Sequence, residues 1–138
     1  MNPKIWGPPT WFFLHSVTLG YPVKPTDIDK QNIKEFFESV GKILPCGKCK
    51  DNYKKHLSKL PLNETVLSSR DNLVKWLIDV HNEVNIATNK STLNYDQAIE
   101  TFISSQNKND NTMVMISIIT IIVIILIILP YVFIQFSK

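Results

Sequence analysis

The chain has 138 residues and a net charge of +3, from 15 basic and 12 acidic side chains. This length has room for one domain. The charge is mild and no basic helix face carries interleaved aromatic residues, which argues against a nucleic-acid partner. The chain has only two cysteines, so its fold does not depend on a framework of disulfides.

The N-terminal segment reads as a turn that leads into a helix. Residues 6–11 read Trp-Gly-Pro-Pro-Thr-Trp, and Pro9 suits the first turn of a helix. Trp11 and His15 are four residues apart and therefore share a face. Taken alone, this pair is more simply explained by core packing than by a binding site. The segment lacks a clean apolar run and a small-residue cleavage site, so we expect no secretory signal.

A second helix is expected after a proline-containing linker over residues 21–25. Thr26 followed by Asp29 is a helix start signal, because each side chain can bond to the backbone of the other. Apolar residues then recur at helical spacing as far as Pro45. They are Ile28, Ile33, Phe36, Phe37, Val40 and Leu44. We expect this helix to line the core and assign no chemistry to it.

The two cysteines, Cys46 and Cys49, stand three residues apart and directly after Pro45. Residues 50–60 read as a helix, so both cysteines fall in its first turn and on one face. Unpaired N–H groups and the positive end of the helix dipole stabilise a thiolate there, and neighbouring lysines add positive charge. The spacing allows an intramolecular disulfide or a shared metal ion. A stabilised thiolate is what dithiol–disulfide exchange requires.

Two simpler readings of this pair stay open. It could be half of a zinc site, for which the remaining candidate ligands are His15, His56 and His81. Zinc needs four ligands, however, and the sequence has no second cysteine pair and no closely spaced histidine pair. The cysteines could also be inert core residues. Such residues rarely stand so close together behind a proline and between lysines, so redox exchange fits the pattern better.

A loop is expected over residues 61–68, followed by a helix from Ser69 to Lys90. The apolar stripe of this helix consists of Leu73, Trp76, Leu77, Val80 and Val84. His81 and Asn85 are four residues apart beside that stripe. An imidazole and an amide are costly to bury without partners. They either bond to neighbouring backbone or bind a flat polar ligand.

The C-terminal region predicts a short helix, a linker and a membrane anchor. Asn94 can cap a helix, with Gln97 at the capping-box position, and the polar residues 104–112 read as a flexible linker. Residues 113–136 are apolar and uncharged, and a helix of about 36 Å would span a bilayer. Because two residues follow and no signal precedes, we expect post-translational insertion into a virion or host intracellular membrane. The preceding domain would then face the cytosol.

Three motifs together resemble the Erv/ALR family of FAD-linked sulfhydryl oxidases. They are Trp6-Gly7-x-x-x-Trp11-x-x-x-His15, Pro45-Cys46-x-x-Cys49, and His81-Asn82-x-Val84-Asn85 followed by Lys90. Each motif alone is weak, but their order and spacing over residues 3–103 are specific. The opening residues and the small number of cysteines resemble most the short members encoded by large DNA viruses. The resemblance implies an all-α fold, in which a four-helix bundle plus a short fifth helix cradles FAD, usually as a homodimer.

The resemblance also implies a role for each matching residue. Cys49 would lie beside the flavin and attack its C4a position, while Cys46 would exchange with an incoming thiol. The FAD-contacting positions are matched by Gly7, Trp11, His15, His81, Asn82, Asn85, Lys90 and, less closely, Tyr95. The flavin would supply the redox chemistry, and the protein would supply aromatic stacking, amide hydrogen bonds and positive charge.

The chain departs from many cellular members of that family, because it has no second cysteine pair on a tail. Substrate thiols would therefore reach Cys46 directly. We interpret the chain as an oxidase domain over residues 1–103 with a membrane anchor. It would convert thiols and O2 to disulfides and H2O2, acting on a thioredoxin-like or Cys-x-x-Cys relay protein. The alternative is a tail-anchored adaptor without enzymatic activity, whose cysteine pair is structural or binds a metal.

Overall fold

The regular structure of the chain is entirely helical in the part that the structure describes, which confirms the predicted all-α class. This computed structural model describes the backbone of residues 1–136 and the side chains of residues 1–107 and 112–129. The chain divides into two compact units, residues 1–98 and residues 99–138. Each unit is considered by itself below.

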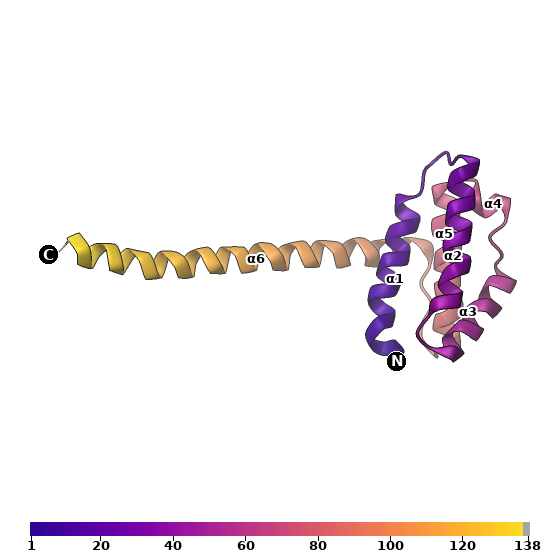
Figure 1. Ribbon diagram of the computed structural model, residues 1–138, viewed down its shortest axis with the longest axis horizontal. Coiled ribbons are helices and arrows are strands. Elements are labelled where there is room, and N and C mark those ends of the chain that lie inside the picture. Colours follow the sequence, from indigo (N-terminus) through magenta and orange to yellow (C-terminus); the bar gives the residue numbers. More distant parts are fainter. Residues whose placement is uncertain (137–138) are drawn as a thin grey trace. The chain divides into compact units, whose positions relative to one another are not determined.

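The first unit is built on the expected bundle of four helices (Figure 1). They are α1 (Pro3–Gly20), α2 (Asp27–Ile43), α3 (Gly47–Lys59) and α5 (Arg70–Ala87). Helix α5 packs against both α1 and α3, and α2 packs against α3. Helix α5 is therefore the element that joins the cysteine helix to the first helix.

The most deeply buried apolar side chains of the bundle come from α2 and α5, and Leu14 of α1 and Tyr53 of α3 complete the core. Four of them are almost fully inaccessible to solvent: Phe37, Leu73, Leu77 and Val80. The ring of Phe37 meets that of Trp76 edge to face, with 4.9 Å between the ring centroids. Ile28, which is expected to line the core, is 70% exposed, because it lies on the side of α2 opposite to the buried Phe37.

Helix α1 begins at Pro3, earlier than the turn predicted over residues 6–11. As a result Pro8 and Pro9 lie inside the helix. A proline lacks the N–H group that would bond to the carbonyl oxygen four residues earlier. The two carbonyl groups that lose their partners belong to exposed residues of the first turn, where water can bind them.

Helices α2 and α3 approach each other closely at Gly41 and Tyr53. The Tyr53 hydroxyl donates a hydrogen bond to the carbonyl oxygen of Phe37, at 3.1 Å. A Cβ atom at Gly41 would lie only 2.7 Å from Cδ1 of the Tyr53 ring. Glycine at this position therefore lets the buried ring of the cysteine helix pack directly on α2.

A short helix, α4 (Glu64–Leu67), interrupts the loop that was predicted over residues 61–68. Its N-cap is Asn63, whose side chain accepts a hydrogen bond from the Val66 N–H group at 3.0 Å. Four residues are too few to produce a periodic apolar pattern, which is why the sequence did not indicate this helix. Helix α4 packs on α5 and buries Leu67.

The last helix, α6 (Tyr95–Phe136), begins at the predicted capping box. Asn94 and Gln97 bond reciprocally, each side chain accepting from the backbone N–H group of the other. The helix continues through residues 104–112, where a flexible linker was expected. Neither glycine nor proline occurs there, and Ser104 and Ser105 bond to carbonyl groups one turn earlier. The domain boundary at 103 and the linker stay predictions.

Helix α6 is apolar enough and long enough to cross a membrane over the described residues 95–129. Its most apolar window has a mean hydropathy of 3.2, and no part of that window is buried. The end of the predicted anchor, residues 130–136, has side chains that are not described, and residues 137 and 138 lie outside the described part.

Candidate active site

A disulfide joins Cys46 and Cys49 at the start of α3, with their Cα atoms 5.1 Å apart. Cys46 is the N-cap of the helix, and its Sγ atom accepts a hydrogen bond from the backbone N–H group of Cys49 at 3.3 Å. Both residues are partly exposed. Across the described residues, no group of three or more His, Cys, Asp or Glu side chains is placed to hold a metal ion.

The start of α3 favours negative charge on the sulfur of Cys46. The first turn of a helix presents unpaired N–H groups and the positive end of the helix dipole. When the disulfide is opened, the Cys49 N–H group can donate to a Cys46 thiolate, while the exposed Lys48 and Lys50 add positive charge nearby. All of these features favour the thiolate over the thiol. Cys46 is therefore suited to disulfide exchange.

A cluster of flat rings joins α1 to α5. The rings of Trp11 and His81 are stacked, with 3.9 Å between centroids and an angle of 5° between planes. His15, one turn after Trp11, completes the cluster through a 3.1 Å hydrogen bond between its Nε2 atom and Nδ1 of His81. The structure thus brings together three predicted site residues, two of which are distant from the third in sequence.

Burial keeps both histidines of this cluster neutral. Desolvation lowers the pKa of His15 from 6.5 to about 4. It also lowers the pKa of His81 from 6.5 to about 4, with smaller contributions from His15 and from the positive charge of Lys90. At pH 7 the pair therefore has ring nitrogens that can donate or accept a hydrogen bond, and neither ring carries a charge.

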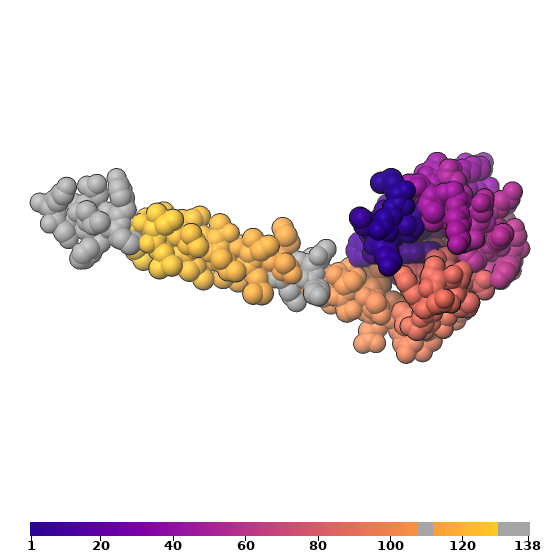
Figure 2. Space-filling view, turned by 90° about the horizontal axis from the view of Figure 1, so that it is seen from below, coloured from indigo at the N-terminus to yellow at the C-terminus, as the bar shows by residue number. Residues whose placement is uncertain are grey.

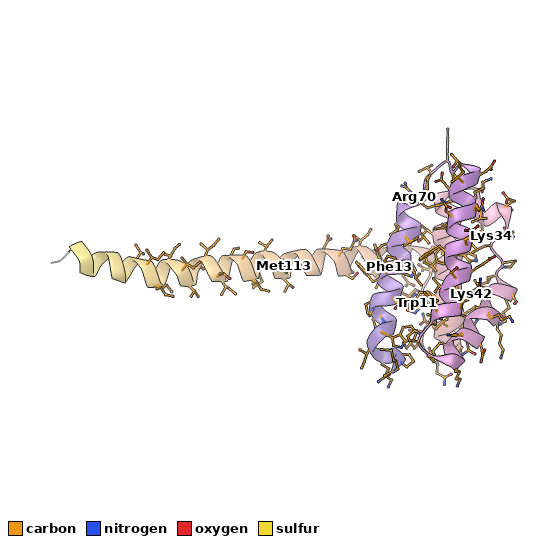
Figure 3. All side chains as sticks on the ribbon, viewed as in Figure 1. Trp11, Phe13, Lys34, Lys42, Arg70 and Met113 are labelled. Atoms are coloured by element: carbon orange, nitrogen blue, oxygen red, sulfur yellow. A yellow bond between two sulfur atoms is a disulfide. The ribbon has the colours of Figure 1, made fainter. Side chains whose placement is uncertain are left out.

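The cysteine turn lies at the same end of the bundle as the start of α1. The backbone nitrogen of Met1 is 3.5 Å from the carbonyl oxygen of Pro45, directly before the cysteines. Figure 3 places Trp11 in the half of α1 nearer this end and Arg70, at the start of α5, near the opposite end. Figure 2 shows the bundle from this end. The indigo start of α1 and the neighbouring purple residues lie side by side on the surface that faces the viewer.

The second half of α5 and the turn after it carry the remaining predicted polar contacts. The amide of Asn82 donates to the carbonyl oxygen of Leu93 at 2.8 Å and accepts from the Leu93 N–H group at 3.1 Å. It therefore holds the segment that contains Lys90, whose N–H group bonds to the Asn85 carbonyl at 2.8 Å. Within the described part of the chain, the half-buried Asn85 side chain makes no hydrogen bond, so its amide is available to a ligand.

Two other predicted contacts are not part of this group. A Cβ atom at Gly7 would meet no atom within 4 Å, so packing inside the protein does not require glycine there. The hydroxyl of Tyr95 donates to a carboxylate oxygen of Asp79 at 3.1 Å. On α5, Asp79 and His81 are two residues apart and so face opposite sides of the helix. The assignments of Gly7 and Tyr95 as FAD contacts stay predictions.

Two further residues, which the sequence did not mark as cofactor contacts, have buried ring nitrogens without a hydrogen-bond partner among the described residues. The first is Trp6 on α1, whose indole N–H group is buried without a hydrogen-bond partner among the described residues. Its carbonyl oxygen accepts from the Thr10 hydroxyl at 2.8 Å, within the same helix. The second is His56, which is buried on α3 with its Nδ1 atom 3.4 Å from a carboxylate oxygen of Glu83 on α5.

The sequence signals for these two residues were weak. Trp6 opens the first motif, directly before Gly7, and this position is the signal that the sequence offers. A buried indole N–H group needs a hydrogen-bond partner, and the structure shows that the N–H group of Trp6 is buried without one among the described residues. The sequence offers His56 only as one possible zinc ligand. Glu83 on α5, which lies beside His56, accepts a hydrogen bond from Lys59 at 2.8 Å. His56, Lys59 and Glu83 therefore connect the cysteine helix to α5.

Comparison with known proteins points to the same family that the three sequence motifs resemble. The model of the Erv1/Alr family matches residues 8–107. A protein of Acanthamoeba polyphaga mimivirus, named "Probable FAD-linked sulfhydryl oxidase", is 55% identical over 100 residues, which cover 72% of this chain and 70% of the relative. The mitochondrial FAD-linked sulfhydryl oxidase of Saccharomyces cerevisiae is 35% identical over 79 residues, which cover 57% of this chain and 40% of that protein. The chain thus spans less than half the length of this cellular relative.

Solved structures share the fold. The FAD binding domain of Erv1 from Saccharomyces cerevisiae matches with a TM-score of 0.64 and 31% identity, over 70% of this chain and 89% of that one. The yeast Erv1 core matches with a TM-score of 0.63 and 30% identity, over 70% of this chain and 79% of that one. These matches extend the likeness from the sequence motifs to the arrangement of the helices.

Proposed function

The chain belongs to the Erv1/Alr family, and we propose on this premise that it is an FAD-linked sulfhydryl oxidase. The reaction takes two thiols and O2 to one disulfide and H2O2. The observation that carries the proposal is the partly exposed disulfide between Cys46 and Cys49 at the start of α3. A disulfide at a helix N-terminus can accept electrons from thiols, because the thiolate that it releases is stabilised there.

Thiol exchange at this disulfide proceeds in two steps. A substrate thiolate attacks Sγ of Cys46, which breaks the bond between the cysteines and releases Cys49 as a thiolate. A second substrate thiolate then attacks the substrate sulfur of the mixed disulfide, forming the substrate disulfide and releasing Cys46 as a thiolate. Two electrons are then held by the cysteine pair. The Cys49 N–H group that points at the Cys46 sulfur stabilises the second leaving group.

The ring cluster, together with Asn85, Trp6 and Lys90, offers the kinds of groups that suit a flavin nucleotide. Trp11 and His81 offer flat ring surfaces, and the unbonded Asn85 amide and the buried Trp6 N–H group offer polar contacts. Lys90 offers positive charge for a phosphate group. Bound at these residues, FAD would supply the two-electron redox chemistry that links the cysteine pair to O2. We assign His15 to positioning His81 through their shared hydrogen bond.

The first test is the colour and activity of the purified full chain. We expect flavin absorbance and O2 consumption with dithiothreitol as the thiol. Cys46→Ser and Cys49→Ser should each abolish O2 consumption and retain the flavin, because other residues hold the cofactor. A colourless protein with an intact helical bundle would support the adaptor without enzymatic activity instead.

A second test concerns the cofactor contacts. Replacing His81 and Asn85 together with alanine should release FAD and lower the melting temperature, since a ligand that binds only the folded state stabilises that state. The double variant Lys24→Ala with Lys34→Ala, on exposed positions, serves as a control and should keep its flavin. Full FAD occupancy in the His81 and Asn85 variant would refute the assignment.

We propose a thiol-bearing protein with a Cys-x-x-Cys pair as the substrate, and a homodimer as the working form. The partly exposed Cys46 supports direct access by such a protein. Capture of the mixed disulfide by a Cys49→Ser variant would identify the substrate. Sedimentation of the full chain in detergent would give the oligomeric state, and a monomer with full activity would refute the dimer.

We also propose that the apolar part of α6 anchors the protein in a membrane. The described window is uncharged and exposed along its whole length, which suits lipid better than water. Resistance of the protein to extraction from membranes by alkaline carbonate would support the anchor. The cytosolic orientation stays a prediction. Protease added to sealed membranes should digest the bundle, and protection until detergent is added would place it in a lumen.

A further inference from the structure

The positive charge of the chain is concentrated on the helix that begins at the disulfide. Helix α3 carries five lysines and one aspartate. The whole chain carries 15 basic and 12 acidic residues, so ten basic and eleven acidic residues remain outside α3. Without α3 the chain would therefore be close to neutral and slightly negative. Its positive sign is a property of the cysteine helix.

Most of these lysines have no acidic partner. Lys59 pairs with Glu83 at 2.8 Å. The other four are exposed and take part in no ion pair within the described part of the chain: Lys48, Lys50, Lys54 and Lys55. Two pairs, Lys50 with Lys54 and Lys55 with Lys59, stand four residues apart, a spacing at which like charges destabilise a helix. These two pairs therefore do not stabilise the helix.

The four unpaired lysines, which we term the α3 lysine surface, lie on the helix whose N-cap is the reactive Cys46. Lys48 lies between the two cysteines in sequence, and Lys54 begins about 8 Å from Cys49 along the helix axis. This distance is comparable to the Debye length of about 8 Å at physiological salt. Lys42, exposed at the end of α2, adds positive charge before the cysteines and is labelled in Figure 3. A molecule that delivers a thiol to Cys46 therefore enters this field.

We propose that the α3 lysine surface docks an acidic segment beside the reactive cysteine of the substrate protein. This inference rests on the proposed oxidase function and adds the charge class of its substrate. Complementary charge raises association rates by about 10- to 1000-fold at low salt and fixes the orientation of encounter. An anionic membrane is the less suitable occupant, because a bilayer lying on this surface would cover Cys46 and exclude thiols.

The experiment compares two reduced peptides that differ only in charge. Both contain one Cys-x-x-Cys pair, flanked by four glutamates in one and four lysines in the other. The FAD-loaded full chain in neutral detergent is assayed by O2 consumption, with dithiothreitol as an uncharged reference. We expect kcat/KM to be at least tenfold higher for the acidic peptide at low salt, with the ratio falling as salt is added. Acidic neighbours reduce the thiolate fraction of a peptide, so its intrinsic reactivity opposes this preference.

Charge reversal locates the preference on the helix. The double variant Lys54→Glu with Lys55→Glu leaves the residues beside the cysteines in place. It should reduce the ratio of kcat/KM for the acidic peptide to kcat/KM for the basic peptide at least fivefold. Turnover of dithiothreitol should stay within twofold. The matched control is Lys24→Glu with Lys34→Glu, the same charge change on exposed residues away from the cysteine turn, and it should keep the preference. The milder Lys54→Gln with Lys55→Gln should give an intermediate ratio.

Several outcomes would overturn the inference. Equal kcat/KM for both peptides with normal turnover of dithiothreitol would refute it while leaving the oxidase function intact. Absence of both flavin and dithiothreitol oxidation would refute the oxidase function and this inference together. Chemical acetylation of lysines in the protein, reconstituted in lipid vesicles, tests whether the α3 lysine surface binds a membrane instead. If phosphatidylserine in the vesicles protects Lys54 and Lys55 from acetylation and the acidic peptide does not, the surface binds lipid and the inference is refuted.

Discussion

His15 and His81 share a hydrogen bond across the interface of α1 and α5, with Nε2 of His15 at 3.1 Å from Nδ1 of His81. One ring must donate and the other accept, so the bond requires at least one neutral imidazole. The Trp11 ring stacks on His81 and helps to bury it. Protonation of both rings would break the bond and place two like charges side by side.

The first prediction is a loss of stability in acid. Each histidine has a pKa of about 6.5 in the unfolded chain and about 4 in the folded protein. Between these values the unfolded state binds more protons, so the free energy of unfolding rises with pH. As the pH is lowered from 6.5 to 4, we expect this free energy to fall by up to about 3 kcal/mol for each histidine. The melting temperature should fall with it.

The control for this prediction is His15→Gln with His81→Gln, which removes both titrating groups. This variant should be less stable at pH 7 and should lose less stability between pH 6.5 and pH 4. The measurement is thermal unfolding followed by circular dichroism at a series of pH values. If the variant and the parent show the same pH dependence, other groups are responsible.

The local parts of this fold could be predicted from the sequence, and the contacts between distant segments could not. The capping boxes at Thr26 and at Asn94 depend on residues three apart, and both form as predicted. The stack of Trp11 on His81 depends on how α1 pairs with α5. Spacing placed each residue on a helix face but could not show that the faces meet.

The same distinction explains two features of the structure that the sequence did not indicate. Residues 104–112 read as a linker because asparagine, serine and lysine are common in loops, yet no residue there breaks a helix. The bond from Tyr95 to Asp79 joins the start of α6 to the side of α5 away from His81. That pairing has no signal within either segment.

The second prediction concerns the close approach of α2 and α3. Gly41→Ala should destabilise the protein by about 1–3 kcal/mol, because the added Cβ atom would lie 2.7 Å from the buried ring of Tyr53. The matched control is Gly20→Ala, where a Cβ atom meets nothing within 4 Å. Chemical denaturation should show a loss for the first variant and almost none for the second. Equal stabilities would contradict the close packing of these helices.

The third prediction separates two neighbouring asparagines. Asn82→Ala removes both hydrogen bonds to Leu93 and should lower the stability of the protein without flavin by about 1–3 kcal/mol. Asn85→Ala removes an amide that makes no hydrogen bond in the described part of the chain, and should leave that stability nearly unchanged. Both should weaken FAD binding, the first because the segment that carries Lys90 is released. Titration with FAD and thermal unfolding of the flavin-free protein give the two readouts.

The last prediction is that the bundle functions without the apolar helix. Residues 1–98 form a compact unit, and the buried apolar core extends from Leu14 to Val80. A chain that ends at residue 111 removes the apolar window and retains every candidate site residue. We expect it to be soluble, to bind FAD and to oxidise dithiothreitol at a rate within twofold of the full chain in detergent. Loss of flavin from the shortened chain, with its helices still folded by circular dichroism, would show that residues after 111 take part in the site.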